Sequence, residues 1–334
     1  MNMISTGAFL NEMDASNKQP TVAEKFAAVW EKKNAKAARA GGVSLMALSL
    51  AACGSSSDDT ETPVTPSDNS GVTPIASDLT NGSDLFTGTS GNDTITAGAV
   101  YTPGGNDRIN SLQDEDVISG GAGDDTINIT VTTANDNGNN IITPTMTSVE
   151  NVNVNFASSG ATDELDFQDV TGVVDLALTR VSTDGTVTID NIQDVLVTLT
   201  LSNSGEDTDT IDISFDDDVL IGTTDSLALT VDDVEVASLN IQGEDEEGYE
   251  TVNMTATGDI SVATDFELDS TTSLVIDGAG DVTVADMTVS AGHLHTIDAS
   301  AASGDMDFDL GAANVVEAVN TADSGTQIGF TYKG

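Results

Sequence analysis

Apolar and polar residues alternate in short runs along most of the chain after residue 84, and Gly, Asn, Asp and Ser bound these runs. Alternation with a period of two is typical of β-strands that bury one face. The clearest runs lie in the C-terminal part of the chain. We expect strands at Val149–Val154, Val173–Leu178, Val195–Leu201, Ser226–Val231, Ser238–Ile241, Glu250–Met254, Ser273–Ile276 and Thr296–Ala299.

The spacing of these runs indicates a coiled architecture. Matched apolar positions recur at nearly constant intervals in two series, and the count breaks over 202–238. A period of about 22 favours a β-solenoid over 141–334, although short strands separated by turns also suit a β-sandwich. The two series are Val152, Val174 and Leu196, and then Val252, Leu274 and Ile297.

A motif rich in Gly, Asn and Asp recurs between residues 85 and 130. The segment Gly120–Ile127 (GGAGDDTI) is its fullest copy, and Gly88–Ile95 (GTSGNDTI) and Gly104–Ile109 (GGNDRI) are related copies. Asp114–Ile118 (DEDVI) is a degenerate one. These segments resemble the RTX, or haemolysin-type, calcium-binding repeats, whose consensus is G-G-x-G-x-D-x-U-x.

The resemblance implies a short parallel β-roll in which each repeat forms a Gly-rich turn and a strand, and two repeats close one coil. The first interval between the aspartates that follow the turns is longer than the next two, so we expect a five-residue insertion near 97–102. Every second repeat should stack, which predicts that Asp107 faces Asp125 and that Asp116 faces Asp93. Ile95, Ile109, Ile118 and Ile127 should point into the roll.

Ca²⁺ takes six to eight oxygen ligands from carboxylates and carbonyls, and Gly-rich turns bring carbonyl oxygens inward. The repeats therefore predict calcium as the cofactor. A set of Asx and Gly turns in an ordinary β domain is the alternative. The candidate ligands are Asp93, Asp107, Asp116 and Asp125, with Asn92, Asn106 and Asp124 beside them and Gly91, Gly105, Gly121 and Gly123 in the turns.

The segment 1–52 resembles an export leader. A stretch with four cations ends at Arg39 and precedes the apolar run Val43–Ala52, which is too short to span a bilayer but fits a signal peptide. The junction Leu50–Cys53 (LAAC) resembles the lipobox of bacterial lipoproteins, which implies lipidation of Cys53. The alternative is a chance match in an ordinary apolar turn.

These segments predict four parts: an export leader (1–52), a tether rich in Ser, Thr, Pro and Asp (53–84), calcium repeats (85–130) and an acidic solenoid-like domain (141–334). The expected class is all-β, a short parallel β-roll followed by a β-solenoid. The expected location is the outer membrane or cell surface, with a lipid anchor as the membrane contact.

The charge is strongly acidic, with 56 Asp and Glu against nine Lys and Arg and a net charge of −47. Six of the nine bases and four of the acids precede Cys53, which leaves 52 acids and three bases (Arg108, Arg180 and Lys333) from there onward. A nucleic-acid partner is excluded because it requires a cationic surface. The carboxylates must be solvated, protonated or neutralised by metal, so adaptation to salty water and divalent-cation binding both remain open.

An enzyme is not expected. Cleavage of an acidic polysaccharide needs cations to neutralise the substrate and a base to remove its proton, and the strands carry no cluster of cations. The only histidines, His293 and His295, lack a third metal ligand at a suitable spacing.

The RTX-like start (FTGTSGNDTI), followed by strands such as SVENVNV, ASLNIQG, ETVNMTATGDISV and HTIDAS, resembles surface-layer proteins of some alphaproteobacteria. The resemblance implies that calcium orders the chain and links subunits. The predicted function is therefore an exported, calcium-binding, structural or adhesive surface protein that contacts copies of itself or surface polysaccharide through Ca²⁺. A virion-associated β-solenoid fibre or decoration protein is the alternative, followed by a polysaccharide-acting β-helix enzyme.

Overall fold

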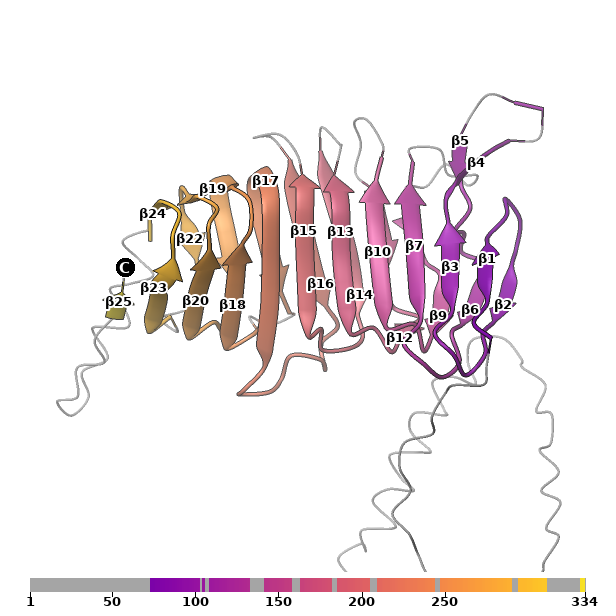
Figure 1. The fold of residues 1–334 in the computed structure, drawn as a ribbon, viewed down its shortest axis with the longest axis horizontal. Helices are drawn as coiled ribbons and strands as arrows, with labels where there is room; N and C mark the ends of the chain where they lie inside the picture. The colour runs from indigo at the N-terminus through magenta and orange to yellow at the C-terminus, as the bar shows by residue number, and fades with distance from the viewer. Residues whose placement is uncertain are drawn as a thin grey trace, which may run out of the picture. The chain divides into compact units, whose positions relative to one another are not determined.

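Parallel strands stacked in register build the part of the chain that the structure, a computed structural model, describes (Figure 1). The described residues are 73–102, 104–105, 108–132, 141–157, 163–181, 185–204, 209–243, 247–289, 294–310 and 331–333. The export leader, Cys53, Asn106, Asp107 and His293 lie outside them.

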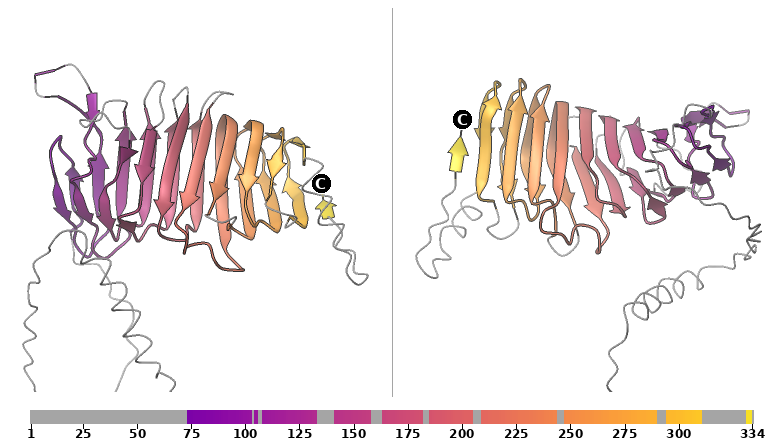
Figure 2. Two further views of the ribbon diagram at one scale, coloured as in Figure 1. Left: turned by 180° about the vertical axis from the view of Figure 1, so that it is seen from behind. Right: turned by 60° about the horizontal axis from the view of Figure 1, so that its bottom comes forward.

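One long ladder runs the length of the described chain, and each strand in it is parallel to both neighbours (Figures 1 and 2). We call it the main ladder. Its strands are β1 (Ala76–Asp78), β3 (Thr94–Ala97), β7 (Thr126–Val131), β10 (Asn151–Phe156), β13 (Asp175–Val181), β15 (Thr198–Ser204), β17 (Ser226–Gln242), β18 (Thr251–Ala256), β20 (Ser273–Gly278), β23 (Thr296–Ala302) and β25 (Thr331–Lys333).

A second parallel ladder forms another side of the coils. It contains β8 (Ile141–Ile142), β11 (Asp163–Asp166), β14 (Thr186–Ile192), β16 (Thr210–Phe215), the end of β17, β19 (Ile260–Leu268) and β22 (Met287–Thr288).

Short ladders complete the coils. Near the N-terminal end they are β2 (Leu85–Thr87), β6 (Val117–Ser119), β9 (Thr145–Thr147) and β12 (Val170–Thr171). Further along, the middle of β17 and the start of β19 continue into β21 (Val282–Val284) and β24 (Met306–Phe308). The protein is thus all-β and a parallel β-solenoid, as predicted, and the β-sandwich alternative is excluded.

Strand alternation creates the core. In β10, Val152, Val154 and Phe156 are fully buried while the residues between them are half-buried. Val152 lies opposite Ile127 on one side and Leu176 on the other, so aliphatic side chains stack from coil to coil. Burial of these stacks away from water is the main stabilising contribution.

The predicted register is confirmed in the C-terminal coils and wrong before them. Val252 pairs with Leu274 and Leu274 with Ile297, as expected from their spacing. Val152, however, pairs with Leu176 and not with Val174, and Leu176 pairs with Leu199 and not with Leu196. Both coils are therefore longer than the predicted period, because the turns before β13 and β15 contain extra apolar residues that imitate strand positions.

The RTX-like region also departs from the predicted stacking. Ala76 lies opposite Thr94, which fits a coil of two repeats, but Thr94 lies opposite Thr126, so the next coil is much longer. The extra length holds an antiparallel hairpin of β4 (Ala99–Tyr101) and β5 (Arg108–Asn110). The predicted five-residue insertion was therefore too short. Asp93 lies opposite Asp125, and the predicted stacking of Asp107 on Asp125 concerns a residue outside the described chain.

The reason is that a Gly-x-Asp-x-Ile motif suits any turn that leads into a strand, and here the copy at Gly105–Ile109 ends on β5, the second strand of the hairpin. The four aliphatic residues of the repeats are buried as predicted, Ile109 on the hairpin included.

Candidate cation site at a corner of the solenoid

Three acidic residues stand directly before successive strands of the main ladder. Asp93, Asp125 and Glu150 precede β3, β7 and β10, and the strand register stacks them. The Asp93 amide donates to Oδ1 of Asp125 (2.7 Å), and the Asp125 amide donates to Oε2 of Glu150 (2.8 Å). We call this stack the acidic corner.

The glycines of the motif allow neighbouring coils to touch here. A Cβ atom on Gly120 would lie 1.8 Å from the Ser148 carbonyl oxygen and 2.4 Å from Oδ2 of Asp125. Gly121 and Gly123 have φ angles of 107° and 131°, which side chains disfavour. Gly91 packs against Gly123, whereas Gly105 lies apart from the corner, against Thr102 beside the hairpin.

Asp93 acts as an anchor for its turn. Its carboxylate accepts hydrogen bonds from the amides of Ile75 and Thr89 and from the Thr89 hydroxyl. Burial raises the pKa of Asp93, but these hydrogen bonds outweigh it and leave the pKa below its ordinary value. The side chain is 1% exposed, so its oxygens are committed to the protein.

Asp116 has a similar role at another corner. Its Oδ1 accepts from the Asp84 amide and its Oδ2 from the Gln113 amide, both at 2.8 Å. The predicted pairing of Asp116 with Asp93 is therefore wrong. The coil that contains the hairpin is longer than predicted, so Asp93 lies opposite Asp125 on the neighbouring coil. Burial raises the pKa of Asp116.

Asp125 differs from both because one oxygen is left over. Its side chain is fully buried, and its Oδ2 has no hydrogen-bond partner within the described residues. Burial, followed by the nearby carboxylates of Glu150, Asp93 and Asp124, raises the pKa of Asp125. An unpaired carboxylate oxygen in this position is costly, so a proton or a cation would stabilise it.

The remaining predicted residues lie around this corner or outside the described chain. Asn92 and Asp124 are exposed, and Oδ1 of Asn92 accepts from the Asp124 amide of the next coil (3.1 Å). They link two turns and contribute exposed polar groups near the acidic corner. Asn106 and Asp107 lie outside the described chain, so their role as calcium ligands stays a prediction.

Sequence reasoning missed Glu150 and a second copy of the same arrangement. The Asp225 amide donates to Oε2 of Glu250 (2.7 Å), and Oδ2 of Asp225 is again buried without a partner among the described residues. Both pairs place an acid directly before each of two strands, one coil of 25 residues apart. This spacing of acids before strands can be read from the sequence. Asp225, however, lacks the glycine motif by which Asp125 was identified.

The fit of calcium to this corner rests on the leftover oxygen. In the part of the chain that the structure describes, no three His, Cys, Asp or Glu side chains converge in the manner of a metal site. The carboxylate oxygens of Asp93 and Asp116 already accept hydrogen bonds from backbone amides. Oδ2 of Asp125, the Glu150 carboxylate and the Ser148 carbonyl oxygen remain as donors, and Ca²⁺ accepts such a mixture with water in its other positions.

Comparison with known proteins adds no relative. No family model matches the chain, and no curated protein or solved structure matches it either. Within the described residues, no helix is long and apolar enough to cross a membrane.

Proposed function

We propose that this protein is an exported, calcium-binding structural or adhesive protein of the cell surface, held there by a lipid on Cys53. The observation that carries the calcium part is the buried, unpartnered Oδ2 of Asp125 in the acidic corner. The excess of carboxylates and the extended parallel solenoid support a surface role, because the protein has few cations of its own to neutralise its faces.

At the acidic corner, Asp125 and Glu150 would hold Ca²⁺ between two successive coils, with Ser148 adding its carbonyl oxygen. The bound ion would supply the positive charge that these two carboxylates lack. Asp93 holds the adjoining turn in place through its three hydrogen bonds, so the donor set is positioned by the fold.

The outer face of the second ladder supports the proposed contacts with other surface molecules. One row of outward residues carries an acid on every second coil, separated by Thr or Asn, which limits repulsion between like charges. Burial and neighbouring carboxylates raise the pKa of all three acids, so each would gain from a cation. The row is Glu164, Thr188, Asp212, Asn240, Glu267 and Thr288.

Thermal unfolding of the full chain tests the calcium proposal. Starting from chelated protein, Ca²⁺ at about ten times its Kd should add about 1.4 kcal/mol of stability. For a domain of this size that raises the unfolding midpoint by about 3 °C. Mg²⁺ should have less effect because it demands stricter octahedral geometry.

The double variant Asp125→Asn/Glu150→Gln should lose this response. Its matched control is Asp217→Asn/Asp218→Asn, which removes the same charge from an exposed turn and should keep the response. The same calcium response in both variants, or none in the unmodified chain, would contradict the proposal. Incorporation of labelled fatty acid at Cys53, absent in Cys53→Ala, tests the anchor separately.

A further inference from the structure

The turn between β1 and β2 contains an Asn-Gly pair, Asn81–Gly82. Gly82 is exposed, and a Cβ atom placed on it would meet nothing within 4 Å, so both neighbouring groups and water can approach its backbone nitrogen. In such a pair this nitrogen can attack the side-chain amide carbon of the asparagine, because the glycine has no side chain that stands in the way. The two reacting groups belong to neighbouring residues, which favours the attack.

The attacking nitrogen is hydrogen-bonded to a hydroxyl that is itself bound to a carboxylate. The Gly82 amide donates to Oγ1 of Thr80 (3.3 Å), and the Thr80 hydroxyl donates to the Asp84 carboxylate (3.1 Å to each oxygen). This hydroxyl also lies 3.3 Å from the Gly82 carbonyl oxygen, but the carboxylate is nearer and charged. The Thr80 amide donates to Oδ2 of Asp84 (2.6 Å) and so fixes the carboxylate at the turn.

A donor stands at the other end of the same peptide group. Nε2 of Gln113, on the next coil, donates to the carbonyl oxygen of Asn81 (3.4 Å), and this carbonyl is conjugated with the Gly82 nitrogen. Loss of the amide proton moves negative charge onto the oxygen, and a donor aimed at an oxygen where charge develops stabilises that charge. Gln113 is 32 residues away in the sequence, so only the folded chain brings it here.

We infer that Asn81–Gly82 is a site of self-catalysed deamidation. The proton of the Gly82 nitrogen passes to Oγ1 of Thr80 while the hydroxyl proton passes to Asp84. The nitrogen then forms a bond to Cγ of Asn81, the bond from Cγ to Nδ2 breaks, and Nδ2 takes up the proton from Asp84 and leaves as ammonia. The product is a succinimide ring.

Water completes the reaction. It adds to one of the two carbonyl carbons of the ring and breaks the bond from that carbon to the Gly82 nitrogen, which takes up a proton. Opening at Cγ leaves an aspartate with an ordinary backbone, and opening at the main-chain carbon leaves an isoaspartate, whose backbone is longer by one methylene. The net change is the exchange of ammonia for water. This inference is independent of the calcium proposal, because no residue of the acidic corner takes part.

Peptide mapping by mass spectrometry of the full chain, sampled during incubation at neutral pH, tests the inference. The reference is a synthetic peptide of residues 76–88, which has the same local sequence but neither Gln113 nor the fixed turn. We expect position 81 to react at least about tenfold faster in the folded chain than in the peptide, because the chain positions a base and a donor. Asn137–Gly138, the other Asn-Gly pair in the sequence, should react at one rate in the parent and in every variant.

Three variants test the proton path and the donor. Thr80→Val removes the hydroxyl and should slow the reaction about tenfold, whereas Thr80→Ser restores the hydroxyl and should restore the rate to within about twofold. Gln113→Met removes the donor and should also slow the reaction about tenfold. Thr80 is exposed, so its two variants should keep the unfolding midpoint of the parent.

The matched control for the donor is Gln168→Met, which removes an exposed glutamine whose Nε2 contacts Asp166 on another coil, and it should leave the rate unchanged. A rate in the folded chain at or below that of the peptide would overturn the inference. Equal rates in Thr80→Val and Thr80→Ser, or equal slowing in Gln113→Met and Gln168→Met, would overturn it as well.

Discussion

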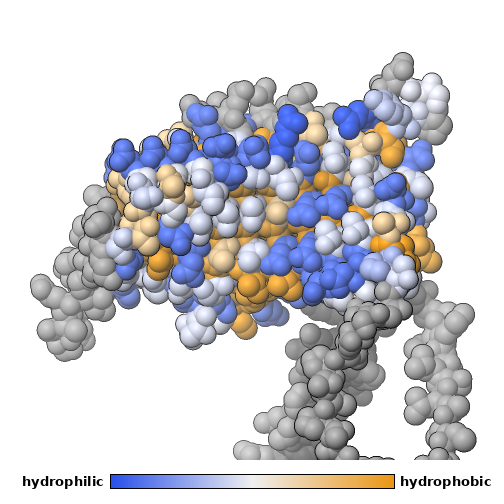
Figure 3. Space-filling view, in the orientation of Figure 1, coloured by the Kyte–Doolittle hydropathy of each residue, from blue (hydrophilic) through white to orange (hydrophobic). Residues whose placement is uncertain are grey.

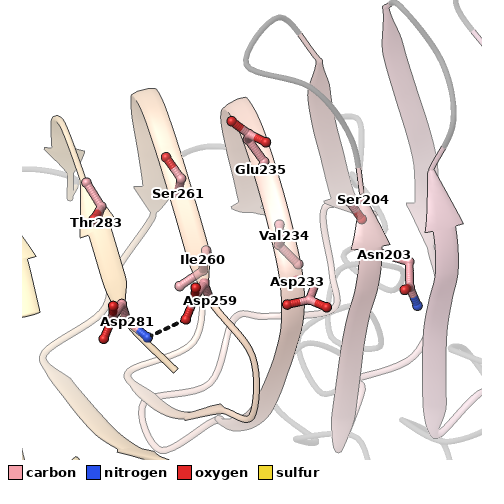
Figure 4. Close-up of a pocket in the computed structure, with 10 residues that line it drawn as sticks. All are labelled: Asn203, Ser204, Asp233, Val234, Glu235, Asp259, Ile260, Ser261, Asp281 and Thr283. Atoms are coloured by element: carbon pink, nitrogen blue, oxygen red, sulfur yellow. Dashed lines mark hydrogen bonds between the residues drawn. The ribbon is translucent and has the colours of Figure 1, made fainter. Parts of the chain in front are cut away.

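Aspartates stack from coil to coil at two corners of the solenoid, and the two stacks differ in their exposure to solvent. At the acidic corner, Asp93 and Asp125 are at most 1% exposed and lie inside the turns. At the C-terminal corner, Asp259 and Asp281 are exposed on the rim of a hollow of about 580 Å³ (Figure 4). In both places a carboxylate accepts the amide of an aspartate on a neighbouring coil.

Burial therefore decides what each aspartate can do. The buried carboxylates depend on the protein for every partner, so one unpaired oxygen at Asp125 becomes a strong site for a cation or proton. The exposed carboxylates are solvated and do not depend on a partner within the protein. In Figure 3, hydrophilic residues follow the edge of the solenoid over β17 to β23.

The largest loss of stability should come from substitution of the glycines at which neighbouring coils touch, one at each corner. Gly120→Ala and Gly280→Ala would each press a Cβ atom to within 1.9 Å of a backbone carbonyl oxygen of a neighbouring coil. We expect each to lower the free energy of unfolding by at least about 3 kcal/mol, measured by urea unfolding. Gly82→Ala is the control, because its Cβ would meet nothing within 4 Å. A loss of stability in only one of the two variants would show that the coils do not pack equally closely at the two corners.

Removal of one aspartate from each corner should separate them. Asp93→Ala leaves two part-buried amides, those of Ile75 and Thr89, without an acceptor and should cost about 2 kcal/mol of stability. Asp281→Ala exposes its amide partner to water and should cost about 0.5 kcal/mol. Urea unfolding of the two variants measures the difference, and equal costs would contradict the distinction by burial.

The leftover oxygen of Asp125 predicts a stabilising substitution. Asp125→Asn keeps the acceptor for the Asp93 amide and replaces the unpaired oxygen with a donor next to the Ser148 carbonyl. Without calcium, the variant should be more stable than the parent by about 1 kcal/mol at neutral pH. A loss of stability without calcium would show that the Oδ2 atom already has a partner.

The smallest effect is a pH dependence of the metal-free protein. The carboxyls with raised pKa keep protons in the fold at a pH where the unfolded chain has lost them. Their contribution is thus present below their ordinary pKa of 3.8 to 4.5 and is lost as pH rises through the raised folded value. The pKa of Asp93 is lowered, so its contribution to stability has the opposite pH dependence. That contribution is lost only below pH 3.8, where protonation would break its hydrogen bonds.

Urea midpoints should therefore fall as pH rises from about 4 to 7, and less steeply in Asp125→Asn. A midpoint that rises over this interval would contradict the directions given for these groups. The groups involved are Asp116, Asp125, Glu164, Asp212 and Glu267.

The sequence predicted the fold class and one side of the coils. Strand alternation located β18, β20 and β23 and their register, because the turns between them are short and regular. It missed β14 and β16, which alternate as clearly as the others but do not follow the predicted period. Turn lengths vary from coil to coil, and Gly, Asn and Asp suit many turns, so the register of the earlier coils could not be read.

The candidate site was predicted only in part for the same reason. Asp93 and Asp125 were identified from the repeat motif, but the contact between them, across 32 residues, was not predicted. Glu150 lies 25 residues after Asp125 and follows from the stacking alone. The stack at the C-terminal corner had a readable signal, since Gly258–Asp259, Gly280–Asp281 and Gly304–Asp305 repeat at intervals of 22 and 24. One dipeptide per coil is too short to stand out in a chain with 56 acids.

Amide hydrogen exchange of the full chain, with and without Ca²⁺, would show whether calcium binds at the acidic corner, because it reports both corners in one experiment. We expect slower exchange with Ca²⁺ in peptides that contain the Asp93 and Asp125 amides, and no change in peptides that contain the Asp281 amide. Equal slowing at both corners would reduce calcium to a general counterion. Slowing at neither would contradict a calcium site at the acidic corner.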